Sequence, residues 1–397
     1  MPGFELFGAE ERKEVNDVLE TGIYMRYGFD GPRKGIWKAK ELEQALCERF
    51  NVEYAQLTSS GTTALTTAMA ALGLGAGDEI IMPTFTFVAS FEAVLSVGAT
   101  PVLVDVDDTM TLDAAAVRAA ITPRTKCVMP VHMCGSMADM DALVEICQEH
   151  NLILLEDACQ STGATHKGRA LGSIGHAGTF SFDFVKTITC AEGGAIITND
   201  KDVYTKCDAY SDHGHDHLGG ADRGADGHPH LGYNFRISEL HAAVGLAQIR
   251  KLDRFLAILR NNHEIVKAAL ATLPEVEFRR IPDPSGDSCT HLSFFLPDLD
   301  TARNAAKAMK AAGLPAFHWF DNNWHYFRKW NHLQEGATLT RFPEQLAKDL
   351  AVYQTKQFPA SDAIIGRCIS FPISLAWTDA EVRERAEKLT AAVKSAL

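Results

Sequence analysis

Lys186 lies in the segment TFSFDFVKTITCAEGGAIITND, residues 179–200, between two apolar runs. The run TFSF precedes it, and a Glu-Gly-Gly turn leads into the run AIIT. Lysine is rarely buried, so a solvated surface charge is the first interpretation of any single lysine. Its second use is covalent, because a lysine amine forms a Schiff base with a carbonyl group. These residues alone leave both interpretations open.

The segment SSGTTALTTAMAALG, residues 59–73, has the pattern of an anion-binding helix start. A strand-like run ends in Ser59, Ser60 and Gly61, and an alanine-rich helix is predicted to begin at once. The first amides of a helix have no partner within it, and phosphate groups bind there. Serine and threonine are also preferred at ordinary helix starts, so a simple N-cap is the alternative.

Asp157 follows an apolar run in LILLEDACQSTG, residues 152–163. A carboxylate at that point requires a partner, because burying an unpaired charge is costly. Gln160 is close enough along the chain to serve the same ligand, and the alternative is an Asp that caps the next helix. In PTFTFVAS, residues 83–90, Phe87 is either an aromatic side chain against a cofactor ring or a core residue.

Short apolar runs alternate with helical patterns from about residue 55 to 200. This alternation predicts an α/β fold with a mostly parallel central sheet and crossover helices on both faces. Ligands in such sheets bind beyond the carboxyl ends of the strands. The runs are AQLTS, EIIMP, PVLVDV, KCVMPV, LILLED, TFSF and AIIT.

The rest of the chain predicts a second, smaller unit. Residues 237–273 are apolar at helical spacing and predict two helices or one bent helix. After them VEFRRI, TARNAAKAMKAAG, PAFHWF, ISFPI and a final amphipathic helix predict a small α/β unit. With 397 residues, two domains are expected. We assign 1–255 to an N-terminal segment and a large cofactor-binding domain, and 256–397 to a bridging helix and a small C-terminal α/β domain.

Taken together, the three motifs predict one cleft. The helix start, Asp157 and Lys186 all follow strand ends of the same predicted sheet, so they are expected to meet at one edge. Pyridoxal phosphate (PLP) requires these groups: a helix start for its phosphate, a carboxylate for its pyridine nitrogen and a lysine for its covalent link. A phosphorylated nicotinamide cofactor would use the first group but not the lysine.

The order SGTTAL, PTFTFVAS, EDACQ, SFDFVK, AEGG and GYNFRISELHAA resembles the DegT/DnrJ/EryC1/StrS sugar aminotransferase family. The resemblance runs through most of the chain and implies the PLP-dependent transferase fold type I, that of aspartate aminotransferase. It also implies the transfer of an amino group from glutamate to a sugar acceptor. Lys186 would be the catalytic residue that binds the cofactor covalently and moves the proton.

The same resemblance implies the other cofactor contacts. Asp157 would pair with the pyridine nitrogen, Gln160 would bond the ring hydroxyl and Phe87 would stack on the ring. Gly61, Thr62 and Ser181 would bind the phosphate. Asn234 would reach the phosphate of the neighbouring subunit's cofactor, which makes a homodimer with shared sites necessary for activity.

Five stretches are more similar to the 8-amino-3,8-dideoxy-manno-octulosonate transaminases, which aminate an eight-carbon sugar acid of lipopolysaccharide: MPGFELFGAEE, VHMCGSM, VKTITC, SDHGHDH and NNWHY.

Two departures from the wider family stand out. Ala191 replaces the usual glycine before Glu-Gly-Gly, where glycine would tolerate unusual backbone angles. HWFDNNWH, residues 318–325, replaces a His-Tyr-Pro and Pro-Leu-His motif that shapes the acceptor pocket in relatives. His318 and His325 are therefore candidate substrate contacts, and a nucleotide-linked acceptor is disfavoured.

A loop rich in histidine and aspartate follows at residues 211–230. Asp212, His213, His215, Asp216 and His217 have the side chains of a zinc or nickel site. Their spacing fits no closed zinc site, so we expect no metal. Instead we predict that His215, His217, Arg223 and Arg236 bind an anionic sugar, and a solvated loop is the alternative.

Charge and composition limit the partners. The formal net charge is −13, which argues against a nucleic-acid partner and an anionic membrane surface. Residues 1–15 lack the pattern of a signal peptide, and we expect a cytoplasmic protein.

Two other function classes stay open beside an aminotransferase. Sugar dehydratases of this fold carry histidine in place of the lysine, and a non-enzymatic sensor or metal-binding protein would hold metal without a covalent cofactor.

Overall fold

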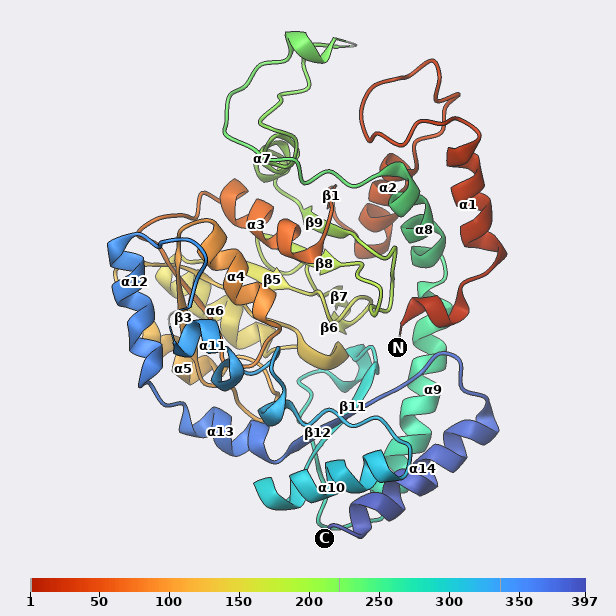
Figure 1. The fold of residues 1–397 in the computed structure, drawn as a ribbon, viewed down its shortest axis with the longest axis vertical. Coiled ribbons are helices and arrows are strands. Elements are labelled where there is room, and N and C mark those ends of the chain that lie inside the picture. Colours follow the sequence, from red (N-terminus) through yellow and green to blue (C-terminus); the bar gives the residue numbers. More distant parts are fainter. Residues whose placement is uncertain (1, 221, 336) are drawn as a thin grey trace.

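A seven-stranded sheet lies at the centre of the protein, which a computed structural model describes for residues 2–220, 222–335 and 337–397 (Figure 1). Each of the seven apolar runs forms one strand, so this part of the prediction is confirmed. The strands are β1 (Tyr54–Thr58), β2 (Glu79–Pro83), β3 (Thr100–Val104), β4 (Thr125–Val128), β5 (Ile153–Asp157), β8 (Ala177–Ser181) and β9 (Gly194–Thr198).

The strand order is β1-β9-β8-β5-β4-β2-β3. β8, β5, β4, β2 and β3 pair in parallel, whereas β9 runs antiparallel to both of its neighbours. The carboxyl ends of β1, β2, β4, β5 and β8 therefore meet at one edge of the sheet. The Lys186 segment connects β8 to β9, and it leaves and re-enters the sheet at this same edge.

Helices cover both faces of the sheet, as the sequence predicts. Neighbouring side chains of one strand pack in two different hydrophobic clusters, because side chains of a strand alternate between its faces. Ile81 and Leu154 pack with α2 and α6, whereas Ile80 and Leu155 pack with α3 and α4. The helices are α1 (Ala9–Leu19), α2 (Lys38–Phe50), α3 (Gly61–Ala71), α4 (Val88–Ser96), α5 (Ala114–Ala120), α6 (Met140–His150), α7 (Lys201–Ser211) and α8 (Glu239–Ile249).

A second, antiparallel sheet belongs to the C-terminal part of the chain. It consists of β10 (Glu277–Phe278), β11 (His291–Phe295) and β12 (Cys368–Pro372), in that order. The remaining elements are the ribbon β6 (Thr165–His166) and β7 (Arg169–Ala170), with α9 (Leu252–Leu270), α10 (Leu299–Ala311), α11 (Asn331–Gln334), α12 (Glu344–Ala351), α13 (Pro359–Gly366) and α14 (Asp379–Lys394). The run PAFHWF forms no regular strand: Phe317 makes a single bridge to Ser370, and a 3-10 turn follows.

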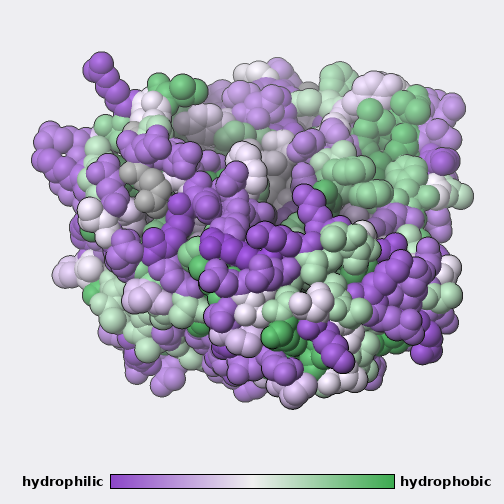
Figure 2. Space-filling view, turned by 60° about the horizontal axis from the view of Figure 1, so that its bottom comes forward, coloured by the Kyte–Doolittle hydropathy of each residue, from purple (hydrophilic) through white to green (hydrophobic). Residues whose placement is uncertain are grey.

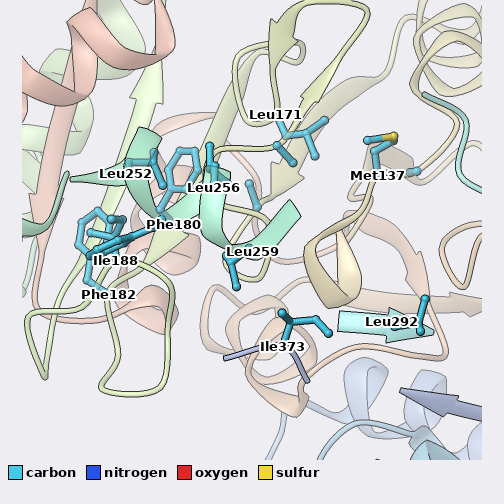
Figure 3. Close-up of a cluster of buried hydrophobic side chains, with 14 of the residues drawn as sticks. Met137, Leu171, Phe180, Phe182, Ile188, Leu252, Leu256, Leu259, Leu292 and Ile373 are labelled. Carbon is cyan, nitrogen blue, oxygen red and sulfur yellow. The ribbon is translucent and has the colours of Figure 1, made fainter. Parts of the chain in front are cut away.

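The predicted pair of helices at 237–273 is present as α8 and α9. The core is continuous across α9, because Leu256 and Leu259 pack in the same cluster as Phe180 of the large sheet and Leu292 of the small one (Figure 3). A division at residue 255 would fall inside α9. The helix therefore fixes the small sheet against the large one.

The segment between η5 (Trp319–Asp321) and α13 packs on the β3 edge of the large sheet. The Tyr353 hydroxyl donates to the Pro101 carbonyl over 2.9 Å and accepts from the Leu103 amide over 2.8 Å. Hydrophilic residues cover most of the face in Figure 2, with hydrophobic residues in small groups between them. Within the described ranges, none of the helices is both long enough and apolar enough to cross a bilayer.

Candidate active site

A pocket of about 530 Å³ lies at the edge where the parallel strands end. It is lined by the ends of β5 and β8, the start of α3, residues 86–90 and the connection between β8 and β9. The structure therefore brings together all the cofactor residues that the sequence predicts within one subunit: Gly61, Thr62, Phe87, Asp157, Gln160, Ser181 and Lys186.

The start of α3 presents unpaired amides to the pocket. Ser60 caps the helix by accepting a hydrogen bond from the Thr63 amide over 3.1 Å. The amides of Gly61 and Thr62 donate to no other group in the part of the chain that is described. A Cβ atom at Gly61 would lie 2.7 Å from Ser181 Cβ, so only glycine lets α3 approach β8 this closely.

Asp157 is 3% exposed at the end of β5. Its Oδ2 accepts from the Ser90 hydroxyl over 2.7 Å, and its Oδ1 accepts from the Cys159 amide over 3.1 Å. Turns follow β5 where the alternative interpretation required a helix, so that alternative is wrong. Over the described ranges, the Asp157 carboxylate has no lysine, arginine or histidine within salt-bridge distance. A cationic ligand group would provide its missing partner.

A hydrogen bond to the side-chain carbonyl group orients Gln160. Its Oε1 accepts from the Cys134 amide over 3.3 Å, so the side-chain NH₂ is the end that remains free for a ligand. Phe87 is 40% exposed and lines the pocket, so its interpretation as a core residue is wrong.

Buried side chains on either side fix the Lys186 segment. Phe182 and Ile188 both lie in the large core with no exposed surface (Figure 3). Among the described residues, no carboxylate lies within ion-pair distance of the Lys186 ammonium. Ala191 adopts a φ of 70°, in the left-handed region that glycine occupies without strain.

Two histidines and two other aromatic side chains from the C-terminal part of the chain also line the pocket. They are His291, Phe317, Trp319 and His325. Burial lowers the pKa of His291 to about 3. Burial, together with the charge of Lys186, also lowers the pKa of His325 to about 3. Both imidazoles are therefore neutral near pH 7.

Hydrogen bonds determine which nitrogen of His325 carries the proton. Asn322 Oδ1 accepts from the Trp324 amide over 2.9 Å, which fixes this atom as an acceptor. His325 Nδ1 lies 2.9 Å from the same oxygen and must therefore be the donor. Since Nδ1 carries the only proton of the neutral ring, Nε2 is a hydrogen-bond acceptor, and it has no partner in the described ranges.

The predicted substrate residues of the loop do not line this pocket. Arg223 Nη2 donates to Asp212 Oδ2 over 2.7 Å, and Arg236 binds the other carboxylate oxygen. Burial alone would raise the pKa of Asp212, but these two hydrogen bonds hold it below its usual value. His215 contacts Asp226 over 3.0 Å. The loop projects from the molecule beyond α7 (Figure 1).

Three further predicted residues also lie elsewhere. His217 stacks on Tyr27, with ring centroids 4.4 Å apart. His318 Nε2 donates to the Gly366 carbonyl over 2.8 Å and its Nδ1 lies 3.1 Å from Asp321 Oδ2, outside the pocket, whereas His325 lines it. Asn234 is exposed and does not line the pocket of its own chain. In the described residues, no group of three or more His, Cys, Asp or Glu side chains is arranged to hold a metal ion.

Sequence reasoning missed Thr86, Ser90, His291 and Trp319, all of which line the pocket. A signal existed for the first two, because they are the polar residues spaced by four in the apolar stretch TFVAS. His291 begins β11, a strand that the sequence analysis did not identify.

A model of the DegT/DnrJ/EryC1/StrS aminotransferase family matches residues 6–390. The chain belongs to this family. The family that the sequence motifs suggested is therefore confirmed, and so is its fold. The enzymes of this family are PLP-dependent aminotransferases, which also confirms the expected class of cofactor.

Three similar proteins illustrate the relationship. GDP-perosamine synthase of Caulobacter vibrioides is 44% identical over 218 residues, which span 55% of this chain and 57% of that protein. The match thus spans little more than half of that relative. 3-Amino-5-hydroxybenzoic acid synthase is 30% identical with a TM-score of 0.82, over 98% of this chain and 97% of that chain. NtdA of Bacillus subtilis, solved with the cofactor PMP, is 25% identical with a TM-score of 0.81, over 99% and 84%.

The residues of this member of the family fit PLP. Unpaired amides at the start of α3 suit a phosphate, and the buried Asp157 lacks a cationic partner. Lys186 lies in the same pocket with its ammonium unpaired in the described chain. Each group that the cofactor requires is thus present, and neither Lys186 nor Asp157 has an ion-pair partner in the described residues.

Proposed function

We propose that this protein is a PLP-dependent aminotransferase that moves an amino group from glutamate to an oxo-sugar. The observation that carries the proposal is the unpaired Lys186 ammonium in the same pocket as Asp157. A lysine and a buried carboxylate that share a pocket and have no ion-pair partners are characteristic of groups that act on a ligand. The presence of Lys186 also disfavours a sugar dehydratase, in which histidine would take its place.

Bound PLP would supply an electron sink that stabilises negative charge on the substrate carbon. The amides of Gly61 and Thr62, with Ser181, would hold its phosphate, and Asp157 would hold its pyridine nitrogen. The free NH₂ of Gln160 would donate to the ring hydroxyl. Lys186 would take a proton at Nζ and return it to the substrate.

On the acceptor side, His325 would act as a neutral hydrogen-bond acceptor. Its Nε2 has a lone pair and no proton, so it would bind a hydroxyl group of a sugar and would repel a carboxylate or phosphate. Phe317 and Trp319 add apolar surface against which the carbon face of a sugar can pack.

The carboxylates of glutamate and of a sugar acid need a positively charged partner other than Lys186. Lys186 is the only lysine or arginine among the described residues that line the pocket. This supports the proposal of a homodimer in which a loop of the partner subunit completes each site. Arg223, Arg236, His215 and His217 stay our candidates for that contribution, together with Asn234 at the cofactor phosphate.

For the acceptor we propose 8-oxo-3,8-dideoxy-manno-octulosonate, on the five stretches similar to the transaminases that aminate this sugar acid. A nucleotide-linked keto-sugar is the second candidate, and the observation that favours it is the 44% identity to GDP-perosamine synthase over 218 residues. A cytoplasmic location stays a proposal that rests on the sequence alone.

The deciding experiment compares turnover of the PLP-loaded protein with glutamate and a panel of acceptors. The panel contains the free eight-carbon oxo-sugar acid, GDP-linked and dTDP-linked keto-sugars, and a simple keto acid as a control. We expect amination of the free sugar acid at a kcat/KM at least tenfold above the others. A nucleotide-linked sugar as the best acceptor would overturn the substrate but not the aminotransferase, and no amination with any acceptor would overturn both.

A further inference from the structure

The Asp157 carboxylate is held by a side chain from another element. Ser90, 2% exposed in the first turn of α4, lies with its Oγ 2.7 Å from Asp157 Oδ2. A carboxylate only accepts, so the serine hydroxyl is the donor. Among the described residues, Ser90 supplies the one hydroxyl that donates to this carboxylate, whose other oxygen accepts from the backbone amide of Cys159.

A second hydroxyl lies behind the first. Thr86 Oγ1 is 2.7 Å from Ser90 Oγ. Since Ser90 gives its single proton to Asp157, Thr86 must donate to Ser90. The alternative acceptor for Thr86 is the Phe87 carbonyl, at the longer distance of 3.2 Å. The hydroxyls therefore form a directional chain from Thr86 through Ser90 to Asp157, in which each bond polarises the next.

The backbone of residues 86–90, which carries these two hydroxyls, is hydrogen-bonded to the segment that contains His325. The Thr86 amide donates to the His325 carbonyl over 3.0 Å, and the Val88 amide donates to the Trp324 carbonyl over 2.8 Å. Residues 86–90 are thus attached at one end to Asp157 and at the other to the segment that carries His325.

We propose that Ser90, supported by Thr86, is a positioning residue that holds the Asp157 carboxylate in the orientation in which it meets the cofactor's ring nitrogen. The proposal rests on the proposed function, because it assigns Asp157 to a bound PLP. Hydrogen bonds to a ligating group fix its orientation, and their loss weakens the ligand although the contact residue itself is intact.

The test uses four variants of the full-length protein: Ser90→Ala, Ser90→Thr, Thr86→Val and Ser96→Ala. Ser96 is the matched control, because it lies in the last turn of the same helix and its Oγ bonds Thr66 over 2.8 Å and not Asp157. For each variant we would measure the PLP dissociation constant, the pH midpoint of the visible absorption of the loaded protein and the unfolding midpoint of the cofactor-free protein.

We expect Ser90→Ala to weaken PLP binding by about tenfold, since it removes a hydrogen bond to a charged group. The ring nitrogen should then lose its proton at a pH about half to one unit lower, because its carboxylate partner is less well placed. Thr86→Val should weaken binding about two- to threefold, with a smaller shift in the same direction. Ser90→Thr retains the hydroxyl and should stay within about twofold of the wild type, as should Ser96→Ala.

The outcomes separate the two proposals. Wild-type protein that binds no PLP would overturn the proposed function itself. Wild-type protein that binds PLP, with Ser90→Ala equal to Ser96→Ala, would overturn the positioning role alone. Equal defects in Ser90→Ala and Ser90→Thr would also overturn it, because the hydroxyl would not be the cause. If Ser90→Ala fails to fold, an unchanged pH midpoint in Thr86→Val contradicts the chain and a lowered midpoint supports it.

Discussion

The pocket and the loop 212–236 are both rich in titratable side chains, but they distribute charge in opposite ways. In the loop, Arg223 and Arg236 share the buried carboxylate of Asp212, and His215 pairs with Asp226. In the pocket, Lys186 and Asp157 have no ion-pair partner among the described residues. The loop uses its charges to hold its own shape, whereas the pocket keeps charges that only a ligand can satisfy.

The largest effect that separates the two regions is expected at Lys186. Lys186→Ala should lower turnover by about 10³-fold or more, because it removes the group that moves the proton. Lys206, which pairs with Asp202 over 2.6 Å on the surface of α7, is the matched control, and Lys206→Ala should leave turnover unchanged. Borohydride treatment of wild-type protein should fix the cofactor mass on the peptide that contains VKTITC. A mass on another lysine would contradict the role of Lys186.

The next largest effect is expected at Asp157. Asp157→Ala should lower turnover about 10²- to 10³-fold, because a preorganised charge opposite the ring nitrogen is lost. Asp113 is the control, since its carboxylate only caps α5 through the Ala115 amide at 2.9 Å. Asp113→Ala should reduce the unfolding free energy by about 1 kcal/mol and leave turnover intact. Near-normal rates in Asp157→Ala would show that its carboxylate serves the fold and not the ligand.

Asp212 tests the loop side of the comparison. Asp212→Ala leaves two arginines without their carboxylate, and we expect a loss of about 2–3 kcal/mol in unfolding free energy, less than for a fully buried pair because both arginines are partly exposed. Turnover should also fall, because Arg223 and Arg236, our candidates for the partner subunit's site, lose the carboxylate that holds them. Asp202→Ala, at the exposed pair with Lys206, should cost less than about 0.5 kcal/mol. A stable Asp212→Ala protein with unchanged turnover would contradict the contribution of these arginines to the partner subunit's site.

The smallest effect concerns pH. His291 in the pocket has a pKa lowered to about 3 by burial, and His263 in α9 a pKa lowered to about 4 for the same reason. In the unfolded chain both titrate near 6.5. As the pH falls from about 6.5 toward these values, the unfolded chain takes up protons that the native protein refuses, so stability is lost.

The measurement is the slope of unfolding free energy against pH between 6.5 and 4.5. Each of His263→Gln and His291→Gln should reduce this slope by up to about 1.4 kcal/mol per pH unit, the value for one proton. Burial raises the pKa of Asp287 to about 6, which acts in the opposite direction: the native protein keeps a proton that the unfolded chain releases above about pH 4. An unchanged slope in both variants would contradict the buried, neutral state of these histidines.

Local pattern predicts the large sheet well. Each of its strands is a short apolar run whose two faces are both buried, so hydrophobicity alone marks it, as in EIIMP for β2. The small sheet was harder to predict. β11 carries polar His291 and Ser293 among apolar residues, and PAFHWF is held by a single bridge and by ring stacking between Phe317 and Trp319 at 4.9 Å. Such tertiary contacts produce no periodic pattern of apolar residues in the sequence.

For the site, too, the sequence predicts some features and not others. Asp157 and Lys186 were predictable because Asp157 ends β5 and Lys186 lies in the connection after β8, at the edge where ligands of a parallel sheet bind. The pairing of Arg223 and Arg236 with Asp212 was not, since it depends on how the loop folds over residues that are 11 and 24 positions apart. The tautomer of His325 likewise depends on one amide oxygen, that of Asn322.

The N-terminal segment is hydrogen-bonded to the backbone that carries Lys186. The Gly3 amide donates to the Lys186 carbonyl over 3.0 Å, Phe4 stacks on Phe184 at 4.4 Å, and a Cβ at Gly3 would lie 2.5 Å from the Thr187 carbonyl oxygen. The amide proton of Gly3 can therefore exchange with solvent deuterium only when this contact opens. Its exchange rate reports the opening of the lysine segment from outside the pocket, and a ligand that holds Lys186 in place should slow it.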